Sequence, residues 1–192
     1  MKSNLYIVEC ANYALNNKFG YWYGTFSQEA TANLLKEKRA QYPNYYDQSR
    51  YNIKFTDQIA AHIRVVDCAG LLKFGLWTNR PSEMPKYNSS QDLSANGFIK
   101  NGCSETGDIS TLPRIPGIIL WKEGHLGISL GDGEYAIEAR GHDYGVQKTR
   151  IADRGWQKWG KCKFVEYPTA TRYTAEQAIS DIKKVVDKYY AQ

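Results

Sequence analysis

The segment 65–72 constrains the fold most, because a short strand pattern changes there into a helical one. Two β-branched residues lead into Asp67 and Cys68, and the small residues after the cysteine open an apolar stretch that predicts a helix over about 68–77. A thiol at a helix start lies near unpaired backbone N–H groups and the positive end of the helix dipole, and both favour the thiolate. Cys68 is therefore read either as an attacking nucleophile or as a small buried hydrophobic residue.

The base for such a nucleophile must come from one of three histidines, and His125 is the best placed. The segment 117–131 predicts a strand, a tight Lys-Glu-Gly turn and a second strand that begins at His125. A third strand over 134–139 follows an Asp-Gly hairpin signal. Glu138 lies on this third strand, where its carboxylate could accept an imidazole N–H and fix the orientation of the ring. Cys68, His125 and Glu138 thus form, in chain order, a nucleophile, a base and an orienting acceptor.

The sequence around the other two histidines gives weaker evidence for a catalytic role. His62 precedes the strand that leads into Cys68 and is predicted to be a structural or surface residue. His142 follows an Arg-Gly pair in a predicted turn, where it either touches substrate or is solvated, and it is the second candidate for the base. Trp156 and Trp159 are expected mainly in the core, with stacking on a sugar or peptide as the alternative.

Two of these segments, VDCAGLL and GHLGISLGDGEYAIEARG, resemble the core motifs of the NlpC-type cell-wall peptidases, which are papain-like cysteine hydrolases that cut peptidoglycan stem peptides. A third segment, GYWYG at residues 20–24, is similar to the Tyr-x-x-Gly element of that family. The runs GHDYGV and RGWQKWG are similar to segments of its phage endolysin branch. The resemblance implies an α+β, papain-like fold, in which a central antiparallel β-sheet packs against helices and the nucleophilic cysteine begins a helix.

The same resemblance implies roles for individual residues. Cys68, His125 and Glu138 take the catalytic positions, and Tyr21 would help the backbone N–H of Cys68 to stabilise the oxyanion. Three features depart from the family pattern. Glu138 stands where His, Asn or Gln is most frequent, and the usual Asp-Cys-Ser-Gly is Asp-Cys-Ala-Gly here. The segment 25–66 is also much longer than in compact relatives, so we expect an insertion with its own fold or contacts.

Three further residues are expected to bind substrate. Asp67 either grips the free amine of the substrate or caps the helix that begins at Cys68, and the two roles are equally supported by the sequence. Trp22, within the segment GYWYG, and His142 complete the expected substrate-binding set.

The chain of 192 residues is predicted to form one NlpC-type domain over 1–192, since its length and 42% hydrophobic content can supply a sizeable core. The long segment 78–116 is rich in Pro, Ser, Asn and Gly and is predicted to be a loop. Because it ends just before the histidine strands, it can border the cleft. Thr174 opens a capping box that predicts a last helix over about 175–190.

The remaining elements follow from periodicity and from turn residues. In chain order, the sequence predicts helices over 4–17 and 27–41, a turn region over 42–51, and strands over 144–149 and 161–167.

The net charge and the cysteine spacing indicate which polymers, metals or cofactors the protein can bind. A net charge of +5 with a pI near 8.9 suits an anionic wall polymer, but Lys and Arg form no sustained face for nucleic acid. No apolar run reaches the ~18–20 residues that a bilayer crossing needs. The four cysteines lack Cys-x-x-Cys spacing, so we expect no metal site and no cofactor. Cys10 and Cys162 are predicted to be buried thiols, and Cys103 is placed in a polar loop.

The first fifteen residues contain no apolar signal-peptide core. We therefore expect a protein that stays cytoplasmic until it is released, as a lysin is, or one whose native leader is absent from this sequence. It is expected to act on the bacterial cell wall as a monomer.

The expected function is that of a cysteine endopeptidase that cleaves peptidoglycan stem peptides at the γ-D-glutamyl to diamino-acid bond, as in a phage endolysin. One alternative keeps the same catalytic residues but makes the chain an N-acetylmuramoyl-L-alanine amidase. Another alternative is an inactive wall-binding module, against which the intact set of Cys68, His125 and Glu138 argues.

Overall fold

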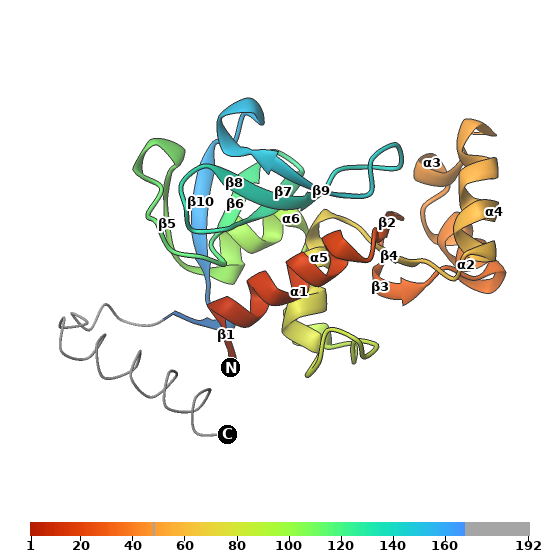
Figure 1. The fold of residues 1–192 in the computed structure, drawn as a ribbon, viewed down its shortest axis with the longest axis horizontal. Helices are drawn as coiled ribbons and strands as arrows, with labels where there is room; N and C mark the ends of the chain where they lie inside the picture. The colour runs from red at the N-terminus through yellow and green to blue at the C-terminus, as the bar shows by residue number, and fades with distance from the viewer. Residues whose placement is uncertain (48, 168–192) are drawn as a thin grey trace, which may run out of the picture.

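The computed structural model describes residues 1–47 and 49–167, and its largest element is an antiparallel six-stranded β-sheet (Figure 1). The strand order is β5-β10-β6-β7-β8-β9. Helices α1 (Asn4–Asn16) and α5 (Cys68–Trp77) pack against each other and against β7 and β8. The predicted α+β class, with a sheet packed on helices and Cys68 at a helix start, is confirmed. The strands of the sheet are β5 (Cys103–Asp108), β6 (Ile119–Lys122), β7 (His125–Ser129), β8 (Tyr135–Ala139), β9 (Val146–Arg150) and β10 (Lys158–Cys162).

Apolar residues cover both faces of this sheet. Successive strand residues point to opposite faces, and Leu126 of β7 joins the core under α1 and α5. On the other face, Leu120 of β6 and Ala136 of β8 pack with the buried Trp156 and Trp159. The prediction that these two tryptophans belong to the core is confirmed, and β7 is held between two packed layers.

The segment 25–66 contributes most of a second group of elements, which Figure 1 shows at the right. Its small sheet has the order β2-β4-β3. The strands are β2 (Gly20–Tyr21), β3 (Phe26–Glu29) and β4 (Arg64–Val66), and the helices are α2 (Ala32–Gln41), α3 (Pro43–Tyr46) and α4 (Asn52–Ala60). A separate apolar cluster, which includes Trp22, Tyr46 and Phe55, holds this group together. The segment 25–66 thus forms helices and strands that pack on this cluster together with β2 and Trp22.

Two predictions in this segment were wrong. The helix expected over 27–41 begins only at Ala32, because Thr31 caps it by accepting the Leu34 N–H at 3.1 Å, while residues 26–29 pair with β4 as a strand. The turn region expected over 42–51 contains the short helix α3, which Pro43 can begin since its fixed φ suits the first helical turn.

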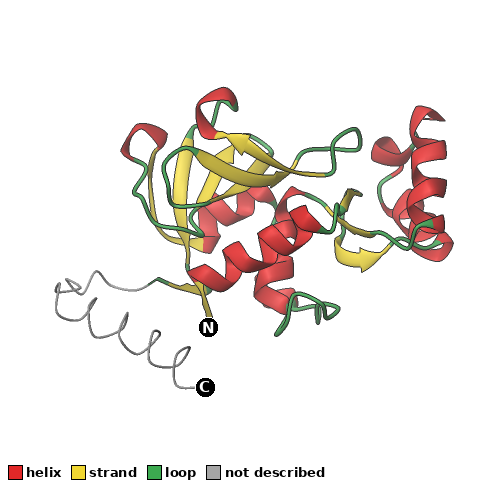
Figure 2. Cartoon of the chain, viewed as in Figure 1, coloured by secondary structure: helices red, strands yellow, loops and turns green. Residues whose placement is uncertain are grey.

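The segment 78–116 is also more structured than predicted (Figure 2). It contains α6 (Ala95–Gly97), a π-helical turn (Phe98–Gly102) and β5, the edge strand of the large sheet. Cys103 therefore lies in a strand, opposite Cys162 of β10, and not in a loop as predicted. Cys10 and Cys162 are fully buried, as predicted.

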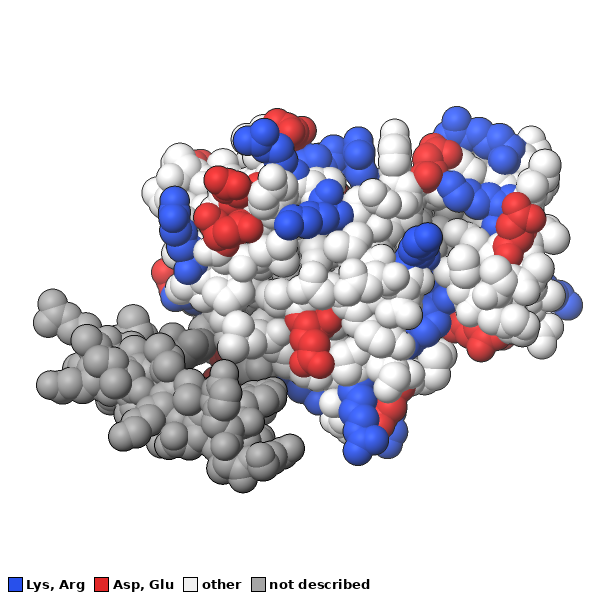
Figure 3. Space-filling view, viewed as in Figure 1, with Lys and Arg blue, Asp and Glu red and all other residues white. Residues whose placement is uncertain are grey.

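Short elements complete the fold. The strands β1 (Lys2–Ser3) and β11 (Val165–Glu166) pair in parallel, and the helix predicted over 175–190 lies outside the described residues. In the described residues, no helix combines the length and apolar character that a membrane crossing requires. Positive and negative side chains are interspersed on the face drawn in Figure 3. The 3₁₀ turns are Ser49–Tyr51, Ser89–Gln91, Ile109–Thr111 and Ile151–Asp153.

Candidate active site

Cys68 is the first residue of α5, and Asp67 caps that helix. One carboxylate oxygen of Asp67 accepts the Gly70 N–H, and the other accepts the Gly24 N–H at 2.8 Å. The helix-capping role predicted as one of two options for Asp67 is therefore present. Gly70 is required by close packing, because a Cβ there would lie 1.8 Å from the carbonyl oxygen of Thr25.

The Cys68 thiol lies against the start of β7. Its Sγ is 3.9 Å from the carbonyl oxygen of Gly124, and the Leu126 N–H is also directed at the sulfur. Burial, reinforced by the neighbouring Asp67, raises the pKa of the Cys68 thiol to about 12, although the N–H groups of Leu126 and Ala69 oppose this rise. The thiol is therefore protonated at neutral pH in this structure, and its use as a nucleophile requires a base.

The His125 ring is fixed on two sides. Its Nε2 lies 2.6 Å from Oε2 of Glu138, and the ring stacks on Trp156 with centroids 5.5 Å apart and planes 10° from parallel. This contact places the predicted orienting carboxylate beside the predicted base. Because Nε2 is engaged by Glu138, Nδ1 is the ring nitrogen left for other chemistry.

Glu138 is fully buried, and Arg154 supplies its counter-charge. Arg154 donates to both carboxylate oxygens, with Nη2 at 2.9 Å from Oε2, and Thr149 donates its hydroxyl at 2.7 Å. Burial raises the pKa of Glu138, but the hydrogen bonds from Arg154, His125 and Thr149 outweigh it and hold the pKa well below its usual range. Glu138 is therefore an ionised acceptor for the His125 ring.

Arg154 was not identified from the sequence. It follows the 3₁₀ turn Ile151–Asp153, in a segment without strand or helix periodicity, so no pattern links it to Glu138. The only available signal was indirect: a carboxylate expected inside a sheet needs a cationic or hydrogen-bonding partner.

The Cys68 thiol and the His125 ring lie near the same end of β7 but on different sides of the sheet. Strand alternation places His125 and Glu138 on the face that carries Trp156, whereas Cys68 belongs to the helix that covers the opposite face. The two side chains flank the backbone at residues 124–126, where β7 begins. Among the described residues, the Cys68 thiol and the His125 ring make no direct hydrogen bond.

Tyr21 lies beside Cys68 and Asp67. Burial raises the pKa of the Tyr21 phenol, and the nearby titratable groups Cys68 and Asp67 add to this rise. No hydrogen-bond partner among the described residues engages its hydroxyl. The ring of Tyr21 contacts that of His142 edge-on, with centroids 5.2 Å apart.

The two remaining histidines differ from His125 in their surroundings. His142 is half-buried among the rings of Tyr21, Tyr46, Tyr51 and Phe55, and this burial lowers the pKa of its imidazole. His62 is exposed and lies 2.6 Å from Glu29, as predicted for a surface residue.

Trp22 has no exposed surface. Its indole N–H donates to Oε1 of Gln58 at 2.7 Å, and its ring packs edge-on against Phe55. The substrate-binding role expected for Trp22 is thus not available in this structure, because the side chain is part of the apolar cluster under the insertion.

A cleft of about 560 Å³ opens beside Cys68. The insertion lines one side of it with residues of α2 and α3, and the segment 78–116 lines another, as predicted for that segment. Tyr23 and Tyr45 stack in its wall, with centroids 3.7 Å apart. Its lining also includes Gly24, Phe26, Lys38, Gln41, Tyr42, Lys73, Tyr87, Asp92, Asn96 and Gly124.

No group of three His, Cys, Asp or Glu side chains within residues 1–47 and 49–167 is arranged so that it could hold a metal ion.

Comparisons with known proteins give two similar solved structures. The sequence matches no known family model and no curated protein. RipB, a peptidoglycan hydrolase from Mycobacterium tuberculosis, is 16% identical with a TM-score of 0.41, and the match covers 84% of this chain and 67% of RipB. The P60 domain of an antigen from M. avium subspecies paratuberculosis is 15% identical with a TM-score of 0.40, and the match covers 84% of this chain and 99% of that domain.

Proposed function

We propose that this chain is a cysteine hydrolase that cleaves peptidoglycan stem peptides by means of Cys68, His125 and Glu138. The observation that carries the proposal is the arrangement at the start of β7. The Cys68 thiol, at the N-terminus of α5, lies against the backbone of Gly124 and Leu126. His125 stands between these two residues, and its ring is bound by the Glu138 carboxylate. A cleft large enough for a peptide opens at this thiol. The same combination of nucleophile, base and orienting acceptor serves acyl transfer on unrelated folds.

The bond formed first in this mechanism is that between the Cys68 sulfur and the carbonyl carbon of the substrate. The thiol and the His125 ring make no hydrogen bond in this structure, so this step requires Nδ1 of His125 to reach the sulfur when substrate binds. His125 then takes the thiol proton as the sulfur attacks, because burial leaves Cys68 protonated beforehand. The ionised Glu138 holds Nε2 and stabilises the imidazolium that forms. His125 then gives the proton to the leaving amine, which leaves a thioester. Water, deprotonated by His125, hydrolyses that thioester and restores the thiol.

The tetrahedral intermediates carry an oxyanion that needs hydrogen-bond donors. The backbone N–H of Cys68, at the first position of α5, has no partner within the helix and is one donor. The Tyr21 hydroxyl, on the neighbouring strand β2, is proposed as the second. Each such donor is typically worth ~2.7–4 kcal/mol in the transition state.

The substrate class rests on the sequence motifs around these residues, which resemble those of NlpC-type cell-wall peptidases. Within that class we propose endopeptidase action at the γ-D-glutamyl to diamino-acid bond, as in the phage endolysin branch. Asp67, already engaged by two backbone N–H groups, also lines the cleft and is kept as a candidate ligand for the substrate amine.

Mass spectrometry of digested peptidoglycan tests this proposal. We expect the native chain to release fragments whose new N-terminus is the diamino acid. Fragments that separate the lactyl sugar from L-alanine would instead show an amidase with the same catalytic residues. If the chain binds cell walls but releases no fragment of either kind, the hydrolase proposal is wrong and the chain is a binding module.

A further inference from the structure

The cleft beside Cys68 contains four charged groups, none of which takes part in the proposed proton transfers. Two lysines, Lys38 and Lys73, and two carboxylates, Asp67 and Asp92, line it. In a cleft that must bind a charged peptide, the group without a protein partner is the one available to the substrate.

Three of the four charges have protein partners. The Lys73 ammonium lies 2.5 Å from one oxygen of Asp92, and the Tyr87 hydroxyl donates to the other oxygen at 3.0 Å. Asp67 accepts two backbone N–H groups through its two oxygens. These three groups are therefore satisfied before any substrate enters.

Lys38 differs from the other three. Within the described part of the chain, its Nζ makes one hydrogen bond, to the neutral amide oxygen of Gln41 at 3.0 Å, and no ion pair. The side chain extends over the Tyr42 ring, with Nζ 5.6 Å from its centroid. Burial lowers the pKa of the Lys38 ammonium, and Asp67 is the carboxylate that opposes this most. Lys38 is thus a half-buried cation, on the Asp67 side of the cleft, without a carboxylate partner.

We propose that Lys38 binds a free carboxylate of the substrate beside the scissile bond, and that this is the α-carboxylate of the glutamyl residue. The proposal rests on the proposed function. In a γ-linked glutamyl residue the attacked carbonyl belongs to the side chain, so the α-carboxylate of the same residue stays free and close to the reacting carbon. An ammonium–carboxylate contact would offset the cost of burying Lys38 and would fix the carbonyl relative to Cys68.

This subsite would give the insertion a function. Lys38 is presented by α2, and Gln41 and Tyr42 beside it come from the same segment. The insertion would thereby select stem peptides with an ionised glutamyl residue over those in which that carboxylate is amidated.

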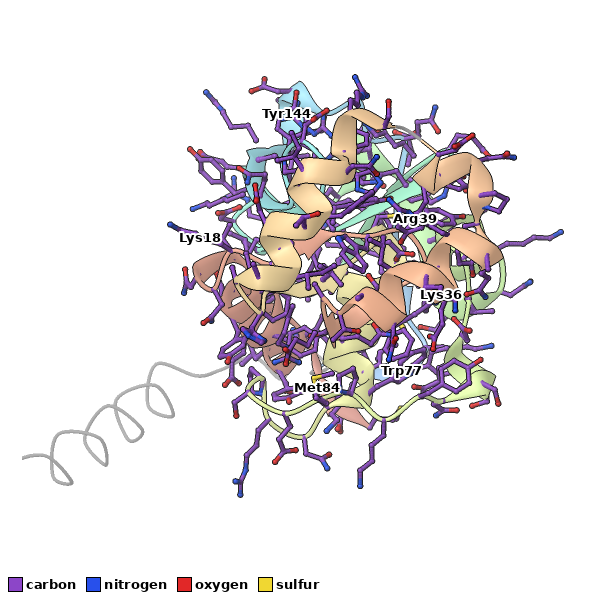
Figure 4. All side chains as sticks on the ribbon, turned by 90° about the vertical axis from the view of Figure 1, so that its right-hand side faces the viewer. Lys18, Lys36, Arg39, Trp77, Met84 and Tyr144 are labelled. Atoms are coloured by element: carbon purple, nitrogen blue, oxygen red, sulfur yellow. The ribbon has the colours of Figure 1, made fainter. Side chains whose placement is uncertain are left out.

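The kinetic test compares two synthetic stem peptides that differ only in whether the glutamyl α-carboxylate is free or amidated. For Lys38→Met, we expect kcat/KM on the free-carboxylate peptide to fall about 10-fold to 100-fold, mainly through KM. Turnover of the amidated peptide should not change, and Lys38→Arg should retain the preference. Lys36→Met is the matched control. Lys36 also lies on α2 (Figure 4) but lines a different groove, with Leu35 and Ile59.

Three results would overturn the proposal. One is an equal loss on both peptides, and another is no loss on either. The third is a Lys38-dependent preference for a free carboxylate on the diamino acid, measured with a third peptide amidated there, because that would assign Lys38 to a different group.

A binding measurement separates this proposal from the proposed function. If the native chain cleaves none of the peptides, the proposed function fails. Calorimetry of peptide binding to the Cys68→Ala chain then tests the carboxylate subsite independently of catalysis. The subsite is supported if the Cys68→Ala chain binds the free-carboxylate peptide with a lower dissociation constant than the amidated peptide, and if adding Lys38→Met removes this difference. Equal affinity for the two peptides contradicts it.

Discussion

The Cys68→Ala chain is expected to hydrolyse no muropeptide, with a rate reduced by about four orders of magnitude or more. The thiol is the proposed attacking group, and no other described cysteine lines the cleft. The free energy of unfolding should change by less than about 1 kcal/mol, since the polar contacts of Sγ are weak: a carbonyl oxygen at 3.9 Å and the Leu126 N–H. Hydrolysis of defined muropeptides and thermal unfolding are the two measurements.

Cys103→Ala is the matched control for this variant. Cys103 is partly exposed on β5, outside the cleft lining, and its loss should leave the hydrolysis rate unchanged. Full activity of the Cys68→Ala chain, or equal losses in the two variants, would remove Cys68 from the mechanism.

The second large effect, on stability and on activity, is expected from Arg154→Ala. This change leaves the fully buried Glu138 carboxylate without its cationic partner, and breaking a buried ion pair in this way typically costs ~3–5 kcal/mol of stability. Activity should also fall, because the carboxylate that orients His125 would lose two of its hydrogen bonds and its pKa would rise. Denaturant unfolding and muropeptide turnover measure the two effects.

Two companion variants make this prediction specific. Glu138→Gln combined with Arg154→Met should be less destabilised than Arg154→Ala alone, because no buried charge is then left unpaired. Arg150→Ala, at an exposed position at the end of β9, should change stability by no more than about 0.5 kcal/mol. Equal stability of the Arg150 and Arg154 variants would show that Arg154 does not support Glu138.

The local parts of the fold were predictable because short-range patterns determine them. α5 begins at Cys68, where Asp67 caps it, and continues through an apolar run that suits a helix buried on all sides. The hairpin from β7 to β8 follows from turn glycines with positive φ at Gly131 and Gly133. These features depend on residues within one or two turns of the chain.

Other parts were missed where tertiary contacts decided the structure. β3 is a strand because it pairs with β4, although its residues continue a helix-like polar pattern. α4 could have been found from the spacing of Tyr51, Phe55 and Ile59, which recur at helical intervals around its buried side.

The site was predictable as a set of residue types but not as an arrangement. Cys68, His125 and Glu138 each carried a local signal, whereas the ion pair of Glu138 with Arg154 depends on a turn that carries none. The burial of Trp22 likewise depends on how the insertion packs, because an aromatic residue beside a motif is equally compatible with core and with surface.

The pH dependence of Cys68 alkylation by iodoacetamide, followed by mass spectrometry of the Cys68 peptide, tests the pairing of the thiol with His125 most directly. The native chain should react near neutral pH although burial raises the thiol pKa to about 12, because His125 accepts the proton. The His125→Ala chain should react at least about tenfold more slowly there and recover its rate only at alkaline pH, whereas His62→Ala, at an exposed position, should behave like the native chain. Equal rates near neutral pH for the native and His125→Ala chains would contradict the proposed pairing.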